Sequence, residues 1–257
     1  MTCPNNYQAE RLNTYVNYFN VHAIEPKIRL GSKKDGGYVI ADIPNAAYDC
    51  YVSAGVSNEE SFSRDFLQKY TIPTADCYAF DGTIEDYPWK FTTNIQFVKK
   101  NISNENTEIT CNLKAIAKKY KNIFLKMDIE SGEYTWINNM ETELLQSFKQ
   151  MVIEFHDVNT NFTKTPQRGL YFKQRCFKKV VDTHYVVHAH GNNFSTATVI
   201  DDNLVPNILE ITYVRKNLFS EQLPLNTINL PCELDKPNKA KKPDYSLNFP
   251  PFRHSKS

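Results

Sequence analysis

Two apolar segments of the chain end in side chains that can do chemistry. LKMDIESGEY turns polar at Asp128 and Glu130, and VIEFHD turns polar at Glu154 and His156. Charged groups beside apolar runs are costly to bury unless they bind something, so such places are candidates for a functional site. We predict a catalytic site here, although acids on exposed loops would give the same pattern.

A third polar group follows the segment THYVVHAHGNN. His188 and His190 are separated by one residue and therefore share a face of a strand, and Asn192 and Asn193 come directly after. A lone histidine would be read as a packed core residue, but five such groups, with His156, predict a polar floor that binds substrate. Tyr38, in KIRLGSKKDGGYVIAD, is a further candidate for the acceptor pocket, although a hairpin there could simply cap the sheet.

Two other segments indicate a site for a nucleoside. YVSAGVSNEESF places Gly55 where a strand gives way to a helix, and a glycine there lets a ligand approach the backbone closely. ADCYAFDGT ends at Asp81, where a carboxylate can accept hydrogen bonds from two ribose hydroxyls. An ordinary turn and a turn aspartate remain the alternatives. The G-x-G-x-x-G pattern of dinucleotide sites is absent, which favours S-adenosylmethionine over NAD or ATP.

The elements that must position these residues alternate between strands and helices. A tight-turn hairpin is predicted over 27–42, and a helix after Gly55 has Ser57 as N-cap and Glu60 as its capping-box partner. Alternation predicts an α/β fold with a mostly parallel sheet, an antiparallel last strand and ligands at the carboxyl ends of the strands. The strands are expected in 49–55, 75–81, 95–102, 122–130, 150–157, 183–193 and 207–216, and the helices in 7–20, 57–70, 110–120, 131–146 and 164–182.

Bulk properties limit the function classes. With 41% hydrophobic residues, 23% charged residues and a net charge of +1, the 257 residues predict one domain without a field that attracts nucleic acid or anionic membranes. Residues 1–26 are expected to form a helical cap and 232–257 a wrapping or frayed tail whose lysines are solvated. No secretory signal or membrane span is visible, so we expect a cytoplasmic protein that acts on a small molecule or glycan, with a homodimer as one expected form.

The order of these motifs resembles the FkbM-like family of S-adenosylmethionine-dependent methyltransferases, over residues 27–216, with LKMDIE-x-GE as the most specific piece. The resemblance implies a Rossmann-like class I methyltransferase fold with helices on both faces of the sheet, and methyl transfer to oxygen, commonly on a sugar or glycan. It implies that Gly55 contacts the cofactor, Asp81 holds its ribose and Asp128 lies beside the sulfonium. We extend the predicted cofactor site to their neighbours Ser53, Gly82, Ile129 and Glu130.

A sugar hydroxyl must lose its proton as it is methylated, and two routes are open. In the first, His156 is the general base and Asp128 or Glu154 orients it. In the second, Mg²⁺ or Mn²⁺ lowers the pKa of the hydroxyl, held by Asp128, Glu154 and His156 or His190. Two other classes remain as alternatives: a nucleotide-sugar or dehydrogenase-like enzyme, and a non-catalytic adenosine-binding module.

Overall fold

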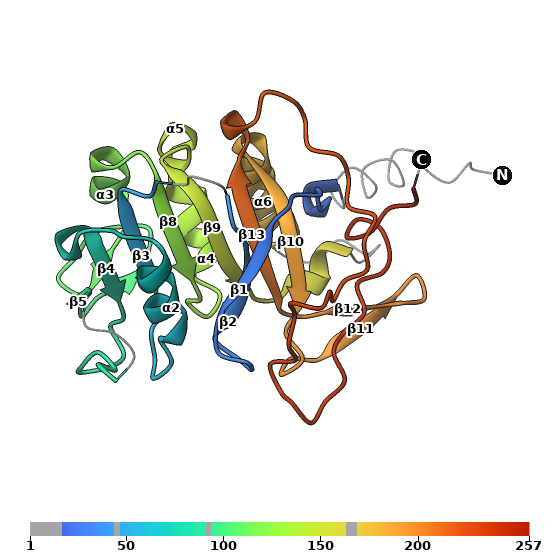
Figure 1. The fold of residues 1–257 in the computed structure, drawn as a ribbon, viewed down its shortest axis with the longest axis horizontal. Coiled ribbons are helices and arrows are strands. Elements are labelled where there is room, and N and C mark those ends of the chain that lie inside the picture. The colour runs from blue at the N-terminus through green and yellow to red at the C-terminus, as the bar shows by residue number, and fades with distance from the viewer. Residues whose placement is uncertain (1–16, 44–46, 91–93, 163–168, 257) are drawn as a thin grey trace.

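A computed structural model of the chain describes residues 17–43, 47–90, 94–162 and 169–256. Its centre is a seven-stranded sheet (Figure 1). From β9 to β5 all neighbouring strands are parallel, whereas β13 is antiparallel to both β9 and β10, which confirms the predicted antiparallel last strand. In spatial order the strands are β10 (His184–Gly191), β13 (Leu209–Arg215), β9 (Phe148–Phe155), β8 (Ile123–Met127), β3 (Cys50–Ala54), β4 (Cys77–Phe80) and β5 (Gln96–Val98).

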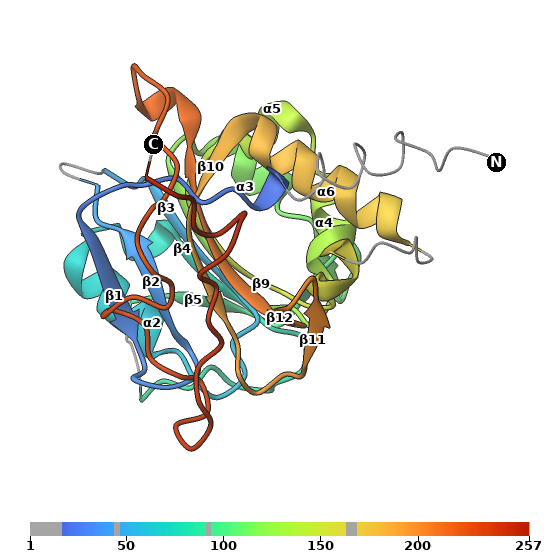
Figure 2. The same cartoon turned by 90° about the vertical axis from the view of Figure 1, so that its right-hand side faces the viewer.

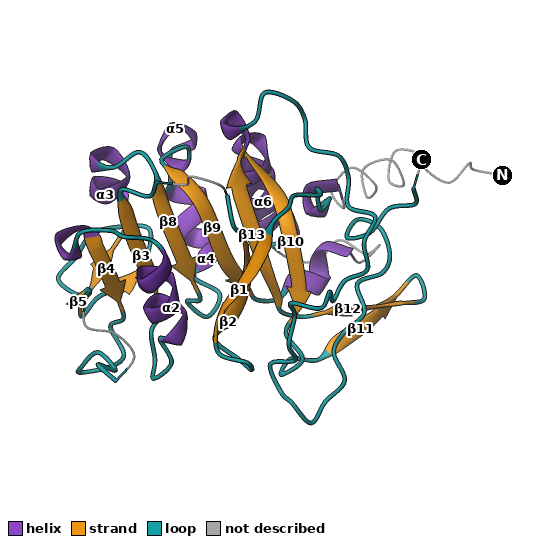
Figure 3. Cartoon of the chain, viewed as in Figure 1, coloured by secondary structure: helices purple, strands orange, loops and turns teal. Residues whose placement is uncertain are grey.

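Helices cover both faces of this sheet (Figures 2 and 3). One face carries α3 (Lys114–Lys119), α4 (Glu133–Asn139), α5 (Thr142–Leu145) and α6 (Leu170–Thr183), and the other carries α2 (Ser61–Lys69). The strands bury both faces, because alternate residues enter different core clusters: Leu125 packs toward α3–α6, and Phe124 packs beside Phe66 of α2.

The predicted hairpin lies on the α2 face of the sheet. Strands β1 (Lys27–Gly31) and β2 (Gly37–Ala41) pair in antiparallel register, and Thr212 of β13 donates its hydroxyl to the carbonyl of Val39 in β2 at 2.6 Å. This contact fixes the hairpin over the centre of the sheet. Asp35 in its turn and Tyr38 in β2 therefore lie at the carboxyl ends of the parallel strands.

Several predicted boundaries differ from the structure. The helix after Gly55 starts at Ser61 instead of Ser57, which has a left-handed backbone (φ 49°) and cannot serve as the N-cap of a capping box. The strand predicted over 95–102 is divided between β5 and the short β6 (Asn101–Ile102), which pairs with β7 (Thr110–Cys111). The helix predicted over 131–146 is divided into α4 and α5. Most of the helix predicted over 7–20 lies outside the described residues, and Asn17–Phe19 form a 3₁₀ turn (η1).

The carboxyl-terminal segment takes the wrapping form of the two that were expected, and its lysines at 236, 239, 241 and 242 are exposed. Asp235, Asn238, Leu247 and Phe252 are buried, and the segment crosses the β10 end of the molecule (Figure 1). Buried apolar anchors and paired polar groups explain why a stretch without periodicity is ordered. The remaining elements are the hairpin of β11 (Ala197–Ile200) with β12 (Asn203–Pro206), and the 3₁₀ turns η2 (Thr74–Asp76), η3 (Val158–Phe162) and η4 (Lys216–Leu218).

Within the described ranges, none of the helices combines the length and apolarity that crossing a lipid bilayer would require.

Candidate functional site

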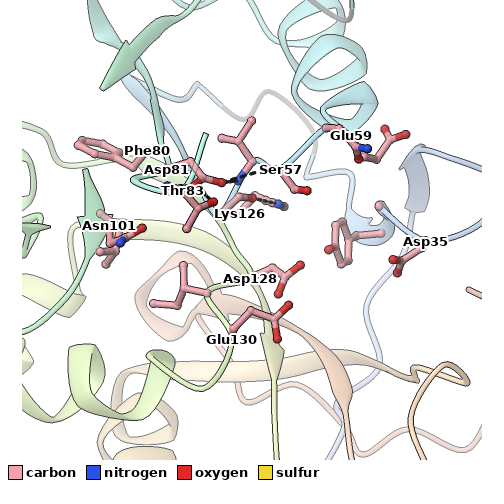
Figure 4. Close-up of a pocket in the computed structure, with 17 residues that line it drawn as sticks. Asp35, Ser57, Glu59, Phe80, Asp81, Thr83, Asn101, Lys126, Asp128 and Glu130 are labelled. Atoms are coloured by element: carbon pink, nitrogen blue, oxygen red, sulfur yellow. Dashed lines mark hydrogen bonds between the residues drawn. The ribbon is translucent and has the colours of Figure 1, made fainter. Parts of the chain in front are cut away.

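A cavity of about 580 Å³ opens at the carboxyl ends of β3, β4 and β8 (Figure 4). Gly55, Asp81 and Asp128 all line it, so the three segments converge as the sequence predicted. Their individual roles stay predictions. The full lining comprises Asp35, Gly36, Tyr38, Gly55, Val56, Ser57, Asn58, Glu59, Phe80, Asp81, Thr83, Asn101, Ile102, Lys126, Asp128, Ile129 and Glu130.

Position 55 requires a glycine for two reasons: its backbone conformation and the close approach of Asp128. Its φ of +79° lies in the left-handed region, and a Cβ atom placed there would lie 1.6 Å from the carbonyl oxygen of Asp128. No other residue type lets β3 and β8 end so close together. The glycine thereby sets the position of Asp128 as well as the course of its own turn.

Asp81 is directed toward the turn after β3. Its Oδ2 accepts the backbone N–H groups of Val56 and Ser57 at 3.0 and 2.9 Å, and its Oδ1 accepts the N–H and hydroxyl of Thr83 at 2.7 and 2.6 Å. Burial alone would raise the pKa of Asp81, but the donors of Ser57, Thr83 and Val56 lower it. A carboxylate has about four acceptor positions, so contact with ribose hydroxyls requires Asp81 to release one of these donors.

A buried ion pair lies beneath the cavity. Lys126 donates its ammonium group to the carbonyl of Gly55 and lies 3.8 Å from the carboxylate of Glu60, which is 1% exposed. The same carboxylate accepts the hydroxyl of Ser53 at 2.9 Å, so Ser53 supports the turn from below and does not line the cavity. Gly82 also lies outside the lining; its N–H donates to Asn101. Burial raises the pKa of Glu60, while Lys126 opposes that rise.

This ion pair was not predicted from the sequence, where Glu60 was assigned to a capping box, although a signal for the pair was present. Lys126 is a charged residue inside the apolar strand segment IFLKM, where an unpaired ammonium would be costly. That position alone predicts a buried acidic partner or a ligand.

His156 does not line the cavity; it lies between two carboxylates, one of which, Glu130, does. Its Nε2 is 3.3 Å from Glu130 Oε2, and its Nδ1 is 3.4 Å from Oε1 of the fully buried Glu133. Although burial by itself lowers the pKa of His156, Glu133 and then Asp128 and Glu130 raise it above its ordinary value. Burial raises the pKa of Asp128 to about 6. Asp128, Glu130 and His156 offer donor atoms that all lie within 4.8 Å of one another.

Glu154 belongs to a separate cluster, on the side of the hairpin. It accepts the hydroxyl of Tyr38 at 3.4 Å and the amide of Asn192 at 3.0 Å, and it stands opposite Glu210 in the β9–β13 register. Burial raises the pKa of Glu154, and Asp128, Glu210 and Asp35 raise it further. The structure thus brings together the predicted residues Tyr38, Asn192 and Glu154, but it does not place Glu154 beside His156.

The other predicted substrate residues lie apart from the cavity. His188 contacts Asp235 at 2.9 Å, and His190 contacts Glu210 and Asp244 at 2.9 and 3.0 Å. Asn193 donates to three carbonyls of the carboxyl-terminal segment: Lys239, Lys242 and Pro243. Burial by itself lowers the pKa of His190. The carboxylates of Glu210 and Asp244 outweigh this effect and raise the pKa to about 10. These three side chains anchor the segment, so they are not available as an open substrate floor.

Comparison with known proteins identifies the family. The model of the methyltransferase FkbM domain matches residues 6–204, more than half of the chain. The chain belongs to the FkbM methyltransferase family. No curated protein matches it. A solved structure entitled putative DNA modification methyltransferase, encoded within a prophage of E. coli, is similar at a TM-score of 0.40 and 11% identity, over 68% of this chain and 51% of that one. The FkbM chain thus spans about half the length of that protein.

Proposed function

We propose that this FkbM-family methyltransferase uses S-adenosylmethionine to methylate a hydroxyl group of a sugar, nucleotide-sugar or glycan, on a Rossmann-like sheet. Family membership supports the methyl transfer and, in general, the cofactor. The order of the sheet supports the site, because ligands of open α/β sheets bind at the carboxyl ends of the strands. The acceptor class follows only from the family resemblance and is the part that an experiment must decide.

The observation that carries the proposal is the charge of the cavity. Five carboxylates line it, from Asp35, Glu59, Asp81, Asp128 and Glu130, whereas Lys126 is the single ammonium or guanidinium group among the described residues of the lining. An acidic cavity attracts a ligand with positive groups and repels phosphates. S-adenosylmethionine carries a sulfonium and an ammonium, while NAD and nucleotide-sugars carry a diphosphate.

The remaining features of the cavity fit the same cofactor. Its volume lies within the range of sites for ligands of this size. Gly55 lines the cavity with backbone alone, Phe80 and Ile102 supply apolar surface for a base, and the ammonium of Lys126, which is paired with Glu60, is a positive group at the wall. When bound, S-adenosylmethionine supplies a methyl group that its sulfonium has already activated.

The chain itself must position the acceptor and remove the proton of its hydroxyl. Tyr38 and Asn192, which share Glu154, are the groups that we propose for holding the acceptor. Removal of the proton is assigned to the end of the cavity at Asp128, to which His156 is adjacent, either by His156 as base or by a cation that the two side chains hold. Glu133, rather than Glu154, is the carboxylate that orients His156.

Transfer of label tests this function. The protein is incubated with methyl-labelled S-adenosylmethionine and panels of sugars, nucleotide-sugars and glycans, and products are identified by mass spectrometry. We expect an O-methylated product, and His156→Ala should lower turnover about 10²–10⁴-fold while the cofactor still binds. Label on nitrogen or carbon of the product would refute the acceptor class. Full turnover in His156→Ala would remove His156 from the reaction.

A further inference from the structure

Buried polar atoms at and next to the Asp128 end of the cavity are incompletely paired. Among the described residues Asp128 Oδ1 and Glu133 Oε2 have no hydrogen-bond partner, and His156 Nδ1 has only the 3.4 Å contact with Glu133 Oε1. His156 is 9% exposed and Glu133 is fully buried. Buried polar atoms without a partner are costly, so the unpaired oxygen of Asp128, which lines the cavity, indicates a ligand at this place.

We propose that Asp128, Glu130 and His156 bind a divalent cation of the Mn²⁺ type, with Glu133 as the positioning residue behind His156. The set joins two carboxylates to one imidazole, and their donor atoms lie within 4.8 Å of one another. Ligands of an octahedral ion at about 2.1 Å are about 3 Å apart, close to the 3.3 Å between His156 Nε2 and Glu130 Oε2.

Glu133 supplies the second part of such a site. Metal-binding histidines usually direct their other ring nitrogen at a carboxylate, which fixes the ring and its tautomer. Here the Nδ1 of His156 faces Glu133 Oε1 at 3.4 Å, and that oxygen is itself held at 3.1 Å by the N–H of Ile129. His156 Nε2 is therefore the nitrogen that faces Glu130 and the cation.

Glu130 can move toward a bound ion, and the ion would lie next to the cavity. The side chain of Glu130 is 84% exposed, so it can move toward an ion without repacking the core. Asp128 and Glu130 both line the cavity, so an ion between them would be in reach of an acceptor hydroxyl, whose pKa it would lower. This use of the ion rests on the proposed function, whereas the binding site does not.

The ligand set differs from the one expected from sequence. Glu154 was expected to join Asp128 and His156, but it is bound to Tyr38 and Asn192 on the side of the hairpin. Glu130 takes its place. The two carboxylates suit Mg²⁺ and Mn²⁺ alike, and Mn²⁺, as a transition metal, accepts the additional imidazole nitrogen more readily than Mg²⁺ does.

Titration with Mn²⁺, followed by electron paramagnetic resonance without any cofactor, tests the inference. We expect one ion per chain, with at least a tenfold weaker affinity in Asp128→Asn and Glu130→Gln and a 10–100-fold weaker affinity in Glu133→Gln. Glu59→Gln is the matched control: it lowers the negative charge of the same cavity but removes no ligand, so its loss of Mn²⁺ affinity should be much smaller than that of Glu130→Gln.

Three outcomes would overturn the site: no binding by the wild type, equal binding by wild type and Asp128→Asn, or equal losses in Glu59→Gln and Glu130→Gln. If a buried variant fails to fold, Glu130→Gln still decides, because its side chain is exposed. Calorimetry with S-adenosylmethionine in EDTA separates this inference from the proposed function. Binding of the cofactor without any Mn²⁺ site would refute the cation alone.

Discussion

Substitution of Gly55 by alanine tests the close approach of β3 and β8 that builds the cavity. An alanine at φ +79° costs about 1–2 kcal/mol for the left-handed backbone. Its Cβ would also overlap the Asp128 carbonyl at 1.6 Å, and relief of such overpacking costs about 1–3 kcal/mol. We therefore expect Gly55→Ala to lower the free energy of unfolding by about 2–5 kcal/mol.

Gly169→Ala is the matched control for backbone strain alone. Gly169 has a φ of +85°, and a Cβ added there would meet nothing within 4 Å. Gly169→Ala should lose only the stability that the left-handed backbone costs, about 1–2 kcal/mol. Any gain from a stiffer unfolded chain is common to both variants. The difference between the variants, measured by urea unfolding, isolates the contact with Asp128.

The same pair of variants connects stability to binding. Displacement of Asp128 changes the wall of the cavity, so Gly55→Ala should weaken the binding of S-adenosylmethionine tenfold or more, equivalent to about 1.4 kcal/mol. Gly169→Ala should bind it normally. Equal losses of stability in both variants, with unchanged cofactor affinity, would show that the overlap does not exist and would refute this account of the cavity.

Further predictions concern the polar groups around the cavity and one buried histidine. Asp81→Asn leaves at least one N–H of the turn without its acceptor and should cost about 1–3 kcal/mol in urea unfolding; an unchanged midpoint would contradict its role in the turn. Lys126→Met leaves the carboxylate of Glu60 buried and unpaired and should cost about 3–5 kcal/mol, part of which a second change, Glu60→Gln, should restore. Burial lowers the pKa of His184 from 6.5 to about 4, so the unfolded chain binds the proton first, and stability should fall by on the order of 3 kcal/mol as the pH drops from 6.5 to 4. In His184→Gln that part of the pH dependence should vanish, and its persistence would assign it to other groups.

Sequence reasoning found the sheet because its signals are local. Apolar runs that end in Gly55, Asp81 and Asp128 mark strands and their carboxyl ends, and the rules of parallel sheets then bring these ends together. The hairpin was equally predictable from the paired glycines at 36 and 37.

The details of the site depend on contacts between distant residues, which no local pattern encodes. Ser57 and Glu60 have the spacing of a capping box. In the structure, however, the N–H of Ser57 donates to Asp81, and the carboxylate of Glu60 is paired with Lys126. Tertiary partners thus override a local motif. The histidines of HAHGNN were expected to bind substrate because their partners are also distant in sequence. His188 and His190 contact Asp235 and Asp244 of the carboxyl-terminal segment, 47 and 54 residues further along the chain.

Isothermal calorimetry with four ligands tests the central claim most directly. The account predicts that the wild-type protein binds S-adenosylmethionine and S-adenosylhomocysteine, the latter without the sulfonium charge and therefore more weakly, and that NAD does not bind. A UDP-sugar, which is a candidate acceptor, should not displace either adenosyl ligand from the acidic cavity. Binding of NAD, or no binding of either adenosyl ligand, would contradict the assignment of the cavity at Gly55, Asp81 and Asp128.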